Sequence, residues 1–281
     1  MAAPFDFDAA SALTQGRRCT QEDAVIADYA RGSEVGLAVL ADGMGGHAAG
    51  DVASKIVVTE VFSELMFQRG DVAAFERSVT QNLQDAALAA NACLNQHITV
   101  YPETRGMGAT LVATVIINRN LYWISIGDSP LFLFRDGVLS QLNEDHSMAP
   151  QIEYMVRSGV LSREDARRHP ERNSLTSALS GTDVARIDCP TDPFALWPDD
   201  VLIVASDGLQ FLSNAQIADV MRAHPNATSA ELTDRFLQRI DVLQDPDQDN
   251  VSFSVVRLKA PQTHRLAAVA TGAKQGIRCV G

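Results

Sequence analysis

Cysteine is scarce in this sequence, and the few cysteines form no paired motif. Four occur in 281 residues, at Cys19, Cys93, Cys189 and Cys279, and no two have the short spacing of a zinc-binding or redox pair. Neither a disulfide framework nor a structural zinc site is therefore expected. Widely spaced, unpaired cysteines are typical of a protein in a reducing compartment.

Long hydrophobic runs are also missing. No stretch of about 18 consecutive apolar residues occurs, so the sequence predicts no transmembrane helix. Residues 1–8 contain neither the basic segment nor the apolar segment of a secretory signal. We therefore expect a soluble, cytoplasmic protein.

Positive charge is in short supply. The 23 Lys and Arg residues face 35 Asp and Glu residues, which gives a net charge of −12 at pH 7. This excess disfavours binding to nucleic acid or to an anionic membrane, so neither is expected as a partner. The hydrophobic share of 46% is ordinary for a globular chain, and the length is sufficient to bury a core without disulfides.

Carboxylates stand where apolar runs end. Asp42 follows the apolar run 35–41 and precedes the glycine-rich stretch Gly43-Met44-Gly45-Gly46. Further acidic residues at likely strand ends are Glu22, Asp23, Asp128, Asp207 and Asp249. Oxygen ligands on rigid strand ends suit hard cations such as Mg²⁺ or Mn²⁺, so the pattern predicts a pocket for two metals. A division into two domains would split this site, which favours a single domain.

Short apolar runs alternate with longer helical patterns. Strand patterns rich in Val, Ile and Leu cover 36–41, 110–118, 121–126, 131–135, 201–205 and 251–258. Hairpin turns are predicted at 117–121 and 135–138. Apolar residues at helical spacing predict helices over 58–66, 75–94 and 232–243, the last beginning near Thr228 or Ser229. Strands grouped in hairpins, with helices in pairs, favour an α+β fold of two antiparallel sheets over a parallel doubly wound sheet.

The carboxylates belong to a series of motifs in a fixed order. The series is Arg18-Cys19-Thr20-Gln21-Glu22-Asp23-Ala24, Asp42-Gly43-Met44-Gly45-Gly46-His47, Gly106-Met107-Gly108-Ala109-Thr110, Gly127-Asp128-Ser129, Ser206-Asp207-Gly208 and Asp249-Asn250-Val251. Each motif alone is weak, because Asp-Gly is a common turn dipeptide. Together, over residues 16–258, they resemble the metal-dependent serine/threonine protein phosphatases of the PPM (type 2C) family, in their bacterial form.

The resemblance implies an architecture. It predicts a four-layer α-β-β-α sandwich of two antiparallel sheets flanked by helix pairs, with metals at one edge and a flap subdomain at about 142–186. Residues 1–259 would form the catalytic domain. Residues 260–281 show no periodicity and are expected to be a disordered tail.

The resemblance also assigns a role to each matching residue. The implied metal ligands are Glu22, Asp23, Asp42, Gly43, Asp128, Asp207 and Asp249. Asp42 would bridge two cations, helped by the backbone carbonyl of Gly43. Asp23 and Asp207 would hold one of these cations and Asp249 the other, while Glu22 would act through bound water. Asp128 and Asp207 would share a weak third site.

Arg18 lies five residues before Asp23, where the family has its phosphate-binding arginine. A guanidinium fork matches the oxygens of a phosphate, and the alternative for Arg18 is a surface ion pair. Asn250, beside Asp249, is expected to support the neighbouring loop by hydrogen bonding.

Three features depart from the family pattern or lie outside it. Met44 stands where eukaryotic members have a histidine proposed as general acid, and His47 follows three residues later with a role that does not transfer automatically. Pro130 replaces the arginine usual after Gly-Asp-Ser, which removes a cation near Asp128. His146 and His169, on the flap, are expected to be solvated.

The predicted function is metal-dependent hydrolysis of phosphoserine and phosphothreonine in proteins by an activated water, without a covalent intermediate. Such enzymes commonly oppose a Ser/Thr kinase, and we expect a monomer that acts on phosphorylated proteins. One alternative is a catalytically weak regulatory member of the same fold that binds a phosphoprotein or partner. A second is a two-metal nuclease or small-molecule phosphatase. The polar segment 150–173 is expected to select substrates.

Overall fold

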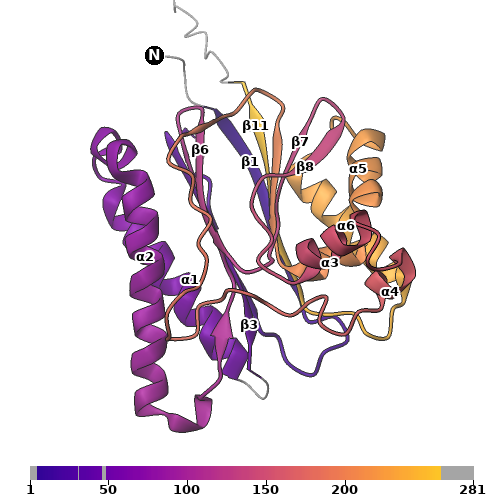
Figure 1. Cartoon of the computed structure of the whole chain (residues 1–281). Helices are drawn as coiled ribbons and strands as arrows, with labels where there is room; N and C mark the ends of the chain where they lie inside the picture. Colours follow the sequence, from indigo (N-terminus) through magenta and orange to yellow (C-terminus); the bar gives the residue numbers. More distant parts are fainter. Residues whose placement is uncertain (1–4, 31, 46–48, 261–281) are drawn as a thin grey trace, which may run out of the picture.

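The computed structural model describes residues 5–30, 32–45 and 49–260, and within them two antiparallel sheets face each other (Figure 1). The strands are β1 (Asp6–Thr14), β2 (Asp23–Asp28), β3 (Val35–Met44), β4 (Gly108–Ala109), β5 (Leu111–Ile117), β6 (Asn120–Ile126), β7 (Leu131–Arg135), β8 (Val138–Gln141), β9 (Phe194–Ala195), β10 (Val201–Ala205) and β11 (Val251–Lys259). One sheet has the order β1-β11-β10-β7-β8 and the other β2-β3-β5-β6-β9, with β4 paired to β3.

Helices cover the outer face of each sheet. The helices of the described residues are α1 (Ala49–Gln68), α2 (Val72–Val100), α3 (Ala149–Arg157), α4 (Arg163–Arg167), α5 (Asn214–Ala223) and α6 (Ser229–Leu243), with short 3-10 turns η1 (Pro102–Thr104) and η2 (Asp207–Phe211). The α1–α2 pair lies on the β2-β3-β5-β6-β9 sheet, and α5 and α6 lie on the other (Figure 1). The predicted α-β-β-α order of layers is confirmed.

The two predicted hairpin turns are present. Ile117 pairs with Asn120 across the β5–β6 turn, where Asn118 adopts a φ of 57°. At the β7–β8 turn, Asp136 has a φ of 51° and Gly137 a φ of 79°. Two-residue hairpins need positive φ values, which Asn, Asp and Gly tolerate best. Turn chemistry therefore sets the register of both hairpins.

The inner core lies between the sheets. Leu40 of β3, Val112 of β5, Leu131 of β7 and Val204 of β10 all lie in it, and each is at most 1% exposed. Strand β5 is buried along its whole length because the opposite sheet covers one of its faces and helices α1 and α2 cover the other. This explains why its sequence is continuously apolar rather than alternating.

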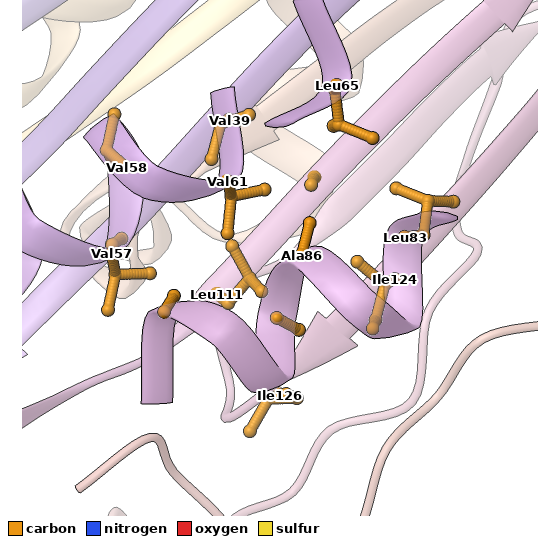
Figure 2. Packing of buried hydrophobic residues seen from close by; sticks show 14 of the residues in the cluster. Val39, Val57, Val58, Val61, Leu65, Leu83, Ala86, Leu111, Ile124 and Ile126 are labelled. Atoms are coloured by element: carbon orange, nitrogen blue, oxygen red, sulfur yellow. The ribbon is translucent and has the colours of Figure 1, made fainter. Parts of the chain in front are cut away.

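The outer core beneath α1 and α2 follows their helical period. Val57, Val61 and Leu65 of α1 and Leu83 of α2 face the sheet, and Figure 2 shows them packed over strand residues that include Ile124. Asp71 caps α2 by accepting a hydrogen bond from the backbone amide of Ala74. The cap stabilises the start of α2, and the apolar stripes of α1 and α2 pack the helix pair on the sheet that contains β3.

Two elements of the second outer layer begin with a capping box. Thr228 and Glu231 cap α6 reciprocally, as the sequence pattern near Thr228 predicts. Ser213 and Gln216 do the same for α5, a helix that the sequence reading does not include. Strand β1 is a second missed element, with one half-buried face and one face that is exposed except at Phe7.

The segment 142–186 carries α3 and α4 and is mostly polar. His146 corrects one expectation, because its side chain is fully buried rather than solvated. Its Nδ1 accepts a hydrogen bond from the backbone amide of Gly127, and its backbone carbonyl accepts two hydrogen bonds from Thr176. Burial, together with nearby Arg186, lowers the pKa of His146. The neutral imidazole therefore joins this segment to the loop that carries Asp128.

Several predictions concern chain ends and compartments. Cys19, Cys93 and Cys189 are free thiols, while Cys279 lies outside the described residues. A membrane-spanning helix is not found in the described part of the chain, where no helix combines enough length with enough apolarity. The predicted tail lies outside the described residues from position 261 onward, as does His47.

Candidate metal-binding and phosphate-binding site

Strand pairing brings the predicted carboxylates together. Asp23 at the start of β2 lies directly opposite Asp42 near the end of β3. Asp128 follows β6, while Asp207 follows β10 at the first position of η2. Asp249 precedes β11, the neighbour of β10 in the other sheet. Antiparallel pairing thus places acidic strand ends from both sheets at the same edge of the sandwich.

Three connected hollows surround this edge. One of about 530 Å³ is lined by Arg18, Glu22, Asp42, Gly43, Asp207 and Asp249, among others. A second, of about 580 Å³, shares Asp42 and Asp207 and adds Asp128 and the segment 173–178. A third, of about 380 Å³, shares Asp128 and Asp207 and is also lined by Asp145 and Arg172. All the predicted ligands except Asp23 line one of these three hollows.

The carboxylates are close enough to alter one another's ionisation. Burial, followed by Asp23, Asp207, Asp128 and Asp249 in that order, raises the pKa of Asp42 well above its usual range. Burial, then Asp207 and Asp145, raises the pKa of Asp128 to about 7. Burial and Asp249 also raise the pKa of Asp207. Such a cluster needs protons or cations to neutralise it.

Asp23 has one satisfied and one unsatisfied carboxylate oxygen. Its Oδ2 accepts a hydrogen bond from the Ser206 hydroxyl at 2.7 Å, and the Ser252 amide donates in turn to that hydroxyl at 3.1 Å. Its Oδ1 is buried without a hydrogen-bond partner. Burial raises the pKa of Asp23 to about 6, and the hydrogen bond from Ser206, with Ser252 close by, opposes this rise. A buried oxygen without a donor has the character of a cation ligand.

Gly43 lies where there is no room for a side chain. A Cβ atom at this position would stand 2.1 Å from the carbonyl oxygen of Gly50 and 2.6 Å from that of Glu22. The amide of Gly43 donates to the Glu22 carbonyl at 3.1 Å. Glu22 itself lies against the start of α1, since a Cβ on Gly50 would be 2.3 Å from Glu22 Oε2. Glycine therefore lets β3, α1 and the Glu22 loop meet at the metal-side edge.

A family model described as protein phosphatase 2C matches residues 10–249. The chain belongs to the protein phosphatase 2C family. The resemblance seen in the motifs is thereby confirmed.

Its relatives are bacterial phosphatases. The serine/threonine phosphatase Stp of Listeria innocua is 30% identical over 240 residues, which cover 83% of this chain and 88% of the relative. The crystal structure of the serine/threonine phosphatase PstP/Ppp of Mycobacterium tuberculosis matches with a TM-score of 0.74 at 29% identity, covering 90% of this chain and 99% of that one. The catalytic domain of PstP in complex with 2 manganese ions matches with a TM-score of 0.72 at 28% identity, covering 91% and 99%.

In this protein phosphatase 2C member, Asn250 fixes the loop that carries the first acidic motif. Its side-chain nitrogen donates to the carbonyls of Gln15 and Thr20, each at 2.9 Å, and its side-chain oxygen accepts from the amide of Glu22 at 2.8 Å. Asn250 is 5% exposed. The predicted supporting role of this residue is therefore what the structure shows.

Two hydroxyl residues that the sequence reading did not single out also support the site. The Thr110 hydroxyl accepts a hydrogen bond from the backbone amide of Asp42 at 2.9 Å, and the Thr110 amide donates to the Asp42 carbonyl. Ser206, beneath Asp23, is the second. Both lie inside the quoted motifs, and this was the available signal.

Arg18 lines the hollow but forms an ion pair with Asp249, and its side chain is 58% exposed. The ion pair is the alternative that the sequence offered for Arg18, while its contact with a substrate phosphate stays a prediction. Within the described residues, no group of three acidic, histidine or cysteine side chains is arranged to hold a metal ion. The donors are gathered, but ion pairs and hydrogen bonds such as Arg18–Asp249 and Ser206–Asp23 engage some of them.

Met44 and Pro130, the two residues that depart from the family pattern, have different surroundings in the structure. Met44 ends β3 and lines the hollows beside Asp42. Pro130 is buried, and its carbonyl accepts a hydrogen bond from the Ala205 amide at 3.1 Å. The proline thus joins the start of β7 to β10, whereas an arginine side chain there would place a cation next to the Asp128 loop.

Proposed function

We propose that this protein removes phosphate from phosphoserine and phosphothreonine in proteins, with Mg²⁺ or Mn²⁺ bound at the acidic edge. The observation that carries the proposal is the cluster of half-buried carboxylates around Asp42, which includes the buried Asp23 with one oxygen that lacks a hydrogen-bond partner. Family membership and the names of the relatives support the same activity.

The donor set fits hard divalent cations. All the candidate ligands are oxygens, from Glu22, Asp23, Asp42, Gly43, Asp128, Asp207 and Asp249. Asp42 is central because four other carboxylates act on its pKa. Asp42 would help to hold both cations, together with Asp23 and Asp207 for one of them and with Asp249 for the other.

The remaining assignments complete the site. Glu22 would hold water ligands, and Asp128 with Asp207 would form a weaker third site. When bound, divalent cations lower the pKa of coordinated water to near neutrality and neutralise charge on the phosphate.

Arg18 is assigned to the substrate phosphate. Its guanidinium lines the same hollow as Asp42 and Asp249, and it has the planar donor fork that phosphate oxygens accept. A cation on Asp249 would weaken the present ion pair and free Arg18 to turn toward the substrate. The side chain keeps enough exposure, 58%, for such a movement.

The rival reading is a regulatory protein of the same fold that binds phosphoproteins without turnover. Loss of ligand carboxylates would favour it, but Asp23, Asp42, Asp207 and Asp249 are all present. The low content of basic residues disfavours a nuclease. Phosphorylated proteins, opposition to a Ser/Thr kinase, and a monomeric state form part of the proposal.

The decisive experiment measures phosphate release from a phosphothreonine peptide with Mn²⁺, Mg²⁺ or chelator. We expect turnover only with metal, and its loss in Asp42→Asn, which keeps the shape of the side chain but removes its charge. Asp192→Asn, on an exposed loop, is the matched control and should retain activity. Absence of turnover by the unmodified protein with either metal would favour the regulatory reading.

A further inference from the structure

The lining of the hollow of about 580 Å³ combines the carboxylate cluster with residues from the segment 173–185. It includes Asp42, Asp128 and Asp207 from the cluster and Asp183 from the segment. Small hydroxyl and apolar side chains make up most of the remaining lining, and no Lys or Arg among the described residues contributes to it. We call this hollow the Asp183 groove.

The loop that carries Asp183 is held firmly to α2. Asn91 Oδ1 accepts hydrogen bonds from the amides of Ser180 and Gly181 at 3.1 and 2.8 Å, and its Nδ2 donates to the carbonyl of Thr182 at 2.7 Å. One turn later, Asn95 donates to the carbonyl of Gly181 at 2.7 Å. These four hydrogen bonds attach the exposed loop to α2, a long helix with one buried face.

Gly181 makes this attachment possible. Its φ is 74°, and a Cβ atom would stand 2.8 Å from the backbone of Asn95. The position therefore needs glycine both for its backbone conformation and for the close approach to α2. A loop anchored in this way presents Asp183 at a defined place, which is the condition for recognition by a surface side chain.

Asp183 itself is exposed and has no ion pair or hydrogen bond to any other described residue. The nearby cation of Arg186 is engaged with Glu144 at 3.1 Å. The negative charge on the groove wall is therefore uncompensated within the described protein. The neighbouring hollow of about 380 Å³ shares Asp128, Asn173 and Asp207 but is lined by Arg172.

We propose that Asp183 selects phosphoprotein substrates that carry a Lys or Arg in the flank lying in the Asp183 groove. The proposal rests on the proposed phosphatase function. When the phosphoresidue of a substrate reaches the carboxylate edge, the residues on one side of it must lie in a groove. In the Asp183 groove, the charge that such residues meet is negative. In the neighbouring hollow Arg172 offsets the charge of Asp145, so the preference for a basic residue is confined to one side of the phosphoresidue.

The test uses pairs of phosphothreonine peptides that differ only by Lys or Glu at one position, moved across about four residues on each side. For each enzyme variant, the ratio of kcat/KM for the Lys peptide to that for the Glu peptide is measured. Exposed ion pairs correspond to about two- to fivefold per charge contact, so the ratio should exceed one by this factor on one flank only. A ratio of this kind cancels changes in metal affinity.

Asp183→Lys should invert the ratio at that position, because attraction becomes repulsion. Asp192→Lys makes the same charge change on an exposed loop and should leave the ratio as in the unmodified protein. Asn91→Ala with Asn95→Ala, which releases the loop but keeps Asp183, should bring the ratio toward one. An unchanged ratio in Asp183→Lys, or equal ratios on both flanks of the phosphoresidue in the unmodified protein, would overturn the proposal.

A second assay distinguishes failure of the proposed phosphatase function from failure of the Asp183 proposal. Turnover of p-nitrophenyl phosphate with Mn²⁺ requires no peptide flank, so its absence in the unmodified protein counts against the proposed function. In that case, binding of the same Lys and Glu peptides, followed by fluorescence anisotropy, tests Asp183 by itself. Tighter binding of the Lys peptide that Asp183→Lys inverts would support the inference, and equal binding of the two peptides would refute it.

Discussion

Replacing Asp128 by Asn should stabilise the metal-free protein, and more so at higher pH. Burial, with Asp207 and Asp145, raises the pKa of Asp128 from 3.8 to about 7. Above pH 3.8 the native state therefore binds more protons than the unfolded state, and stability falls as pH rises until the group is ionised in both states. A difference of about three in pKa corresponds to about 4 kcal/mol.

Part of the Asp128 side chain remains in contact with water, so we expect about half of that value, 2 kcal/mol, to be recovered in Asp128→Asn. For a chain of this size, this corresponds to a rise in Tm of about 4–8 °C.

The measurement is thermal unfolding in chelator at about pH 5 and about pH 8. At the lower pH, most of the penalty is absent because Asp128 stays protonated in the folded state, and the gain in Tm should be smaller. Asp192→Asn, on an exposed loop, is the control and should show no such growth with pH. If the advantage of Asp128→Asn were constant or shrank toward high pH, the assigned repulsion between Asp128, Asp207 and Asp145 would be wrong.

Three further predictions concern the same edge. Arg18→Ala should raise KM by about tenfold or more while kcat falls less, because hydrogen bonds to charged groups contribute about 1.5–3 kcal/mol. If steady-state kinetics gave unchanged KM and kcat, Arg18 would only pair with Asp249. Asn250→Ala should lower the free energy of unfolding, measured by chemical unfolding, by about 1–3 kcal/mol. The substitution leaves the Glu22 amide and the carbonyls of Gln15 and Thr20 without their hydrogen-bond partner. A variant as stable as the parent would contradict this supporting role of Asn250. Mn²⁺ at about a hundredfold excess over its Kd should raise the free energy of unfolding, measured by calorimetry, by about 3 kcal/mol. An equal gain in Asp42→Asn would mean that the cation binds elsewhere.

Much of the fold follows from local sequence. The hairpins at Asn118 and at Asp136-Gly137 are encoded by residues that tolerate positive φ, and the start of α6 by the reciprocal hydrogen bonds of Thr228 and Glu231. The order of the acidic motifs was enough to indicate the family. These signals are readable because turns, caps and strand ends depend on a few adjacent residues.

Other elements lack such a local signature. Strand β1 alternates small and polar residues with only a few large apolar ones, and its pairing with β11 joins residues that are more than 200 positions apart, such as Ala10 and Val255. The burial of His146 likewise depends on Gly127 and Thr176, which approach it only in the folded chain. Because His146 lies in a polar segment, the sequence around it does not indicate that its side chain is buried.

The sequence by itself determined which residues can serve as ligands, because oxygen donors and their order along the chain are properties of the residues. Only the tertiary structure decided how those groups share the edge: Asn250 clamps the Glu22 loop, Ser206 occupies one oxygen of Asp23 and leaves the other free, and Arg18 pairs with Asp249. The physical reason is that pKa values, ion pairs and unsatisfied oxygens depend on distance and burial. Those distances arise when the β2–β3 and β10–β11 pairs bring the ends of two different sheets together.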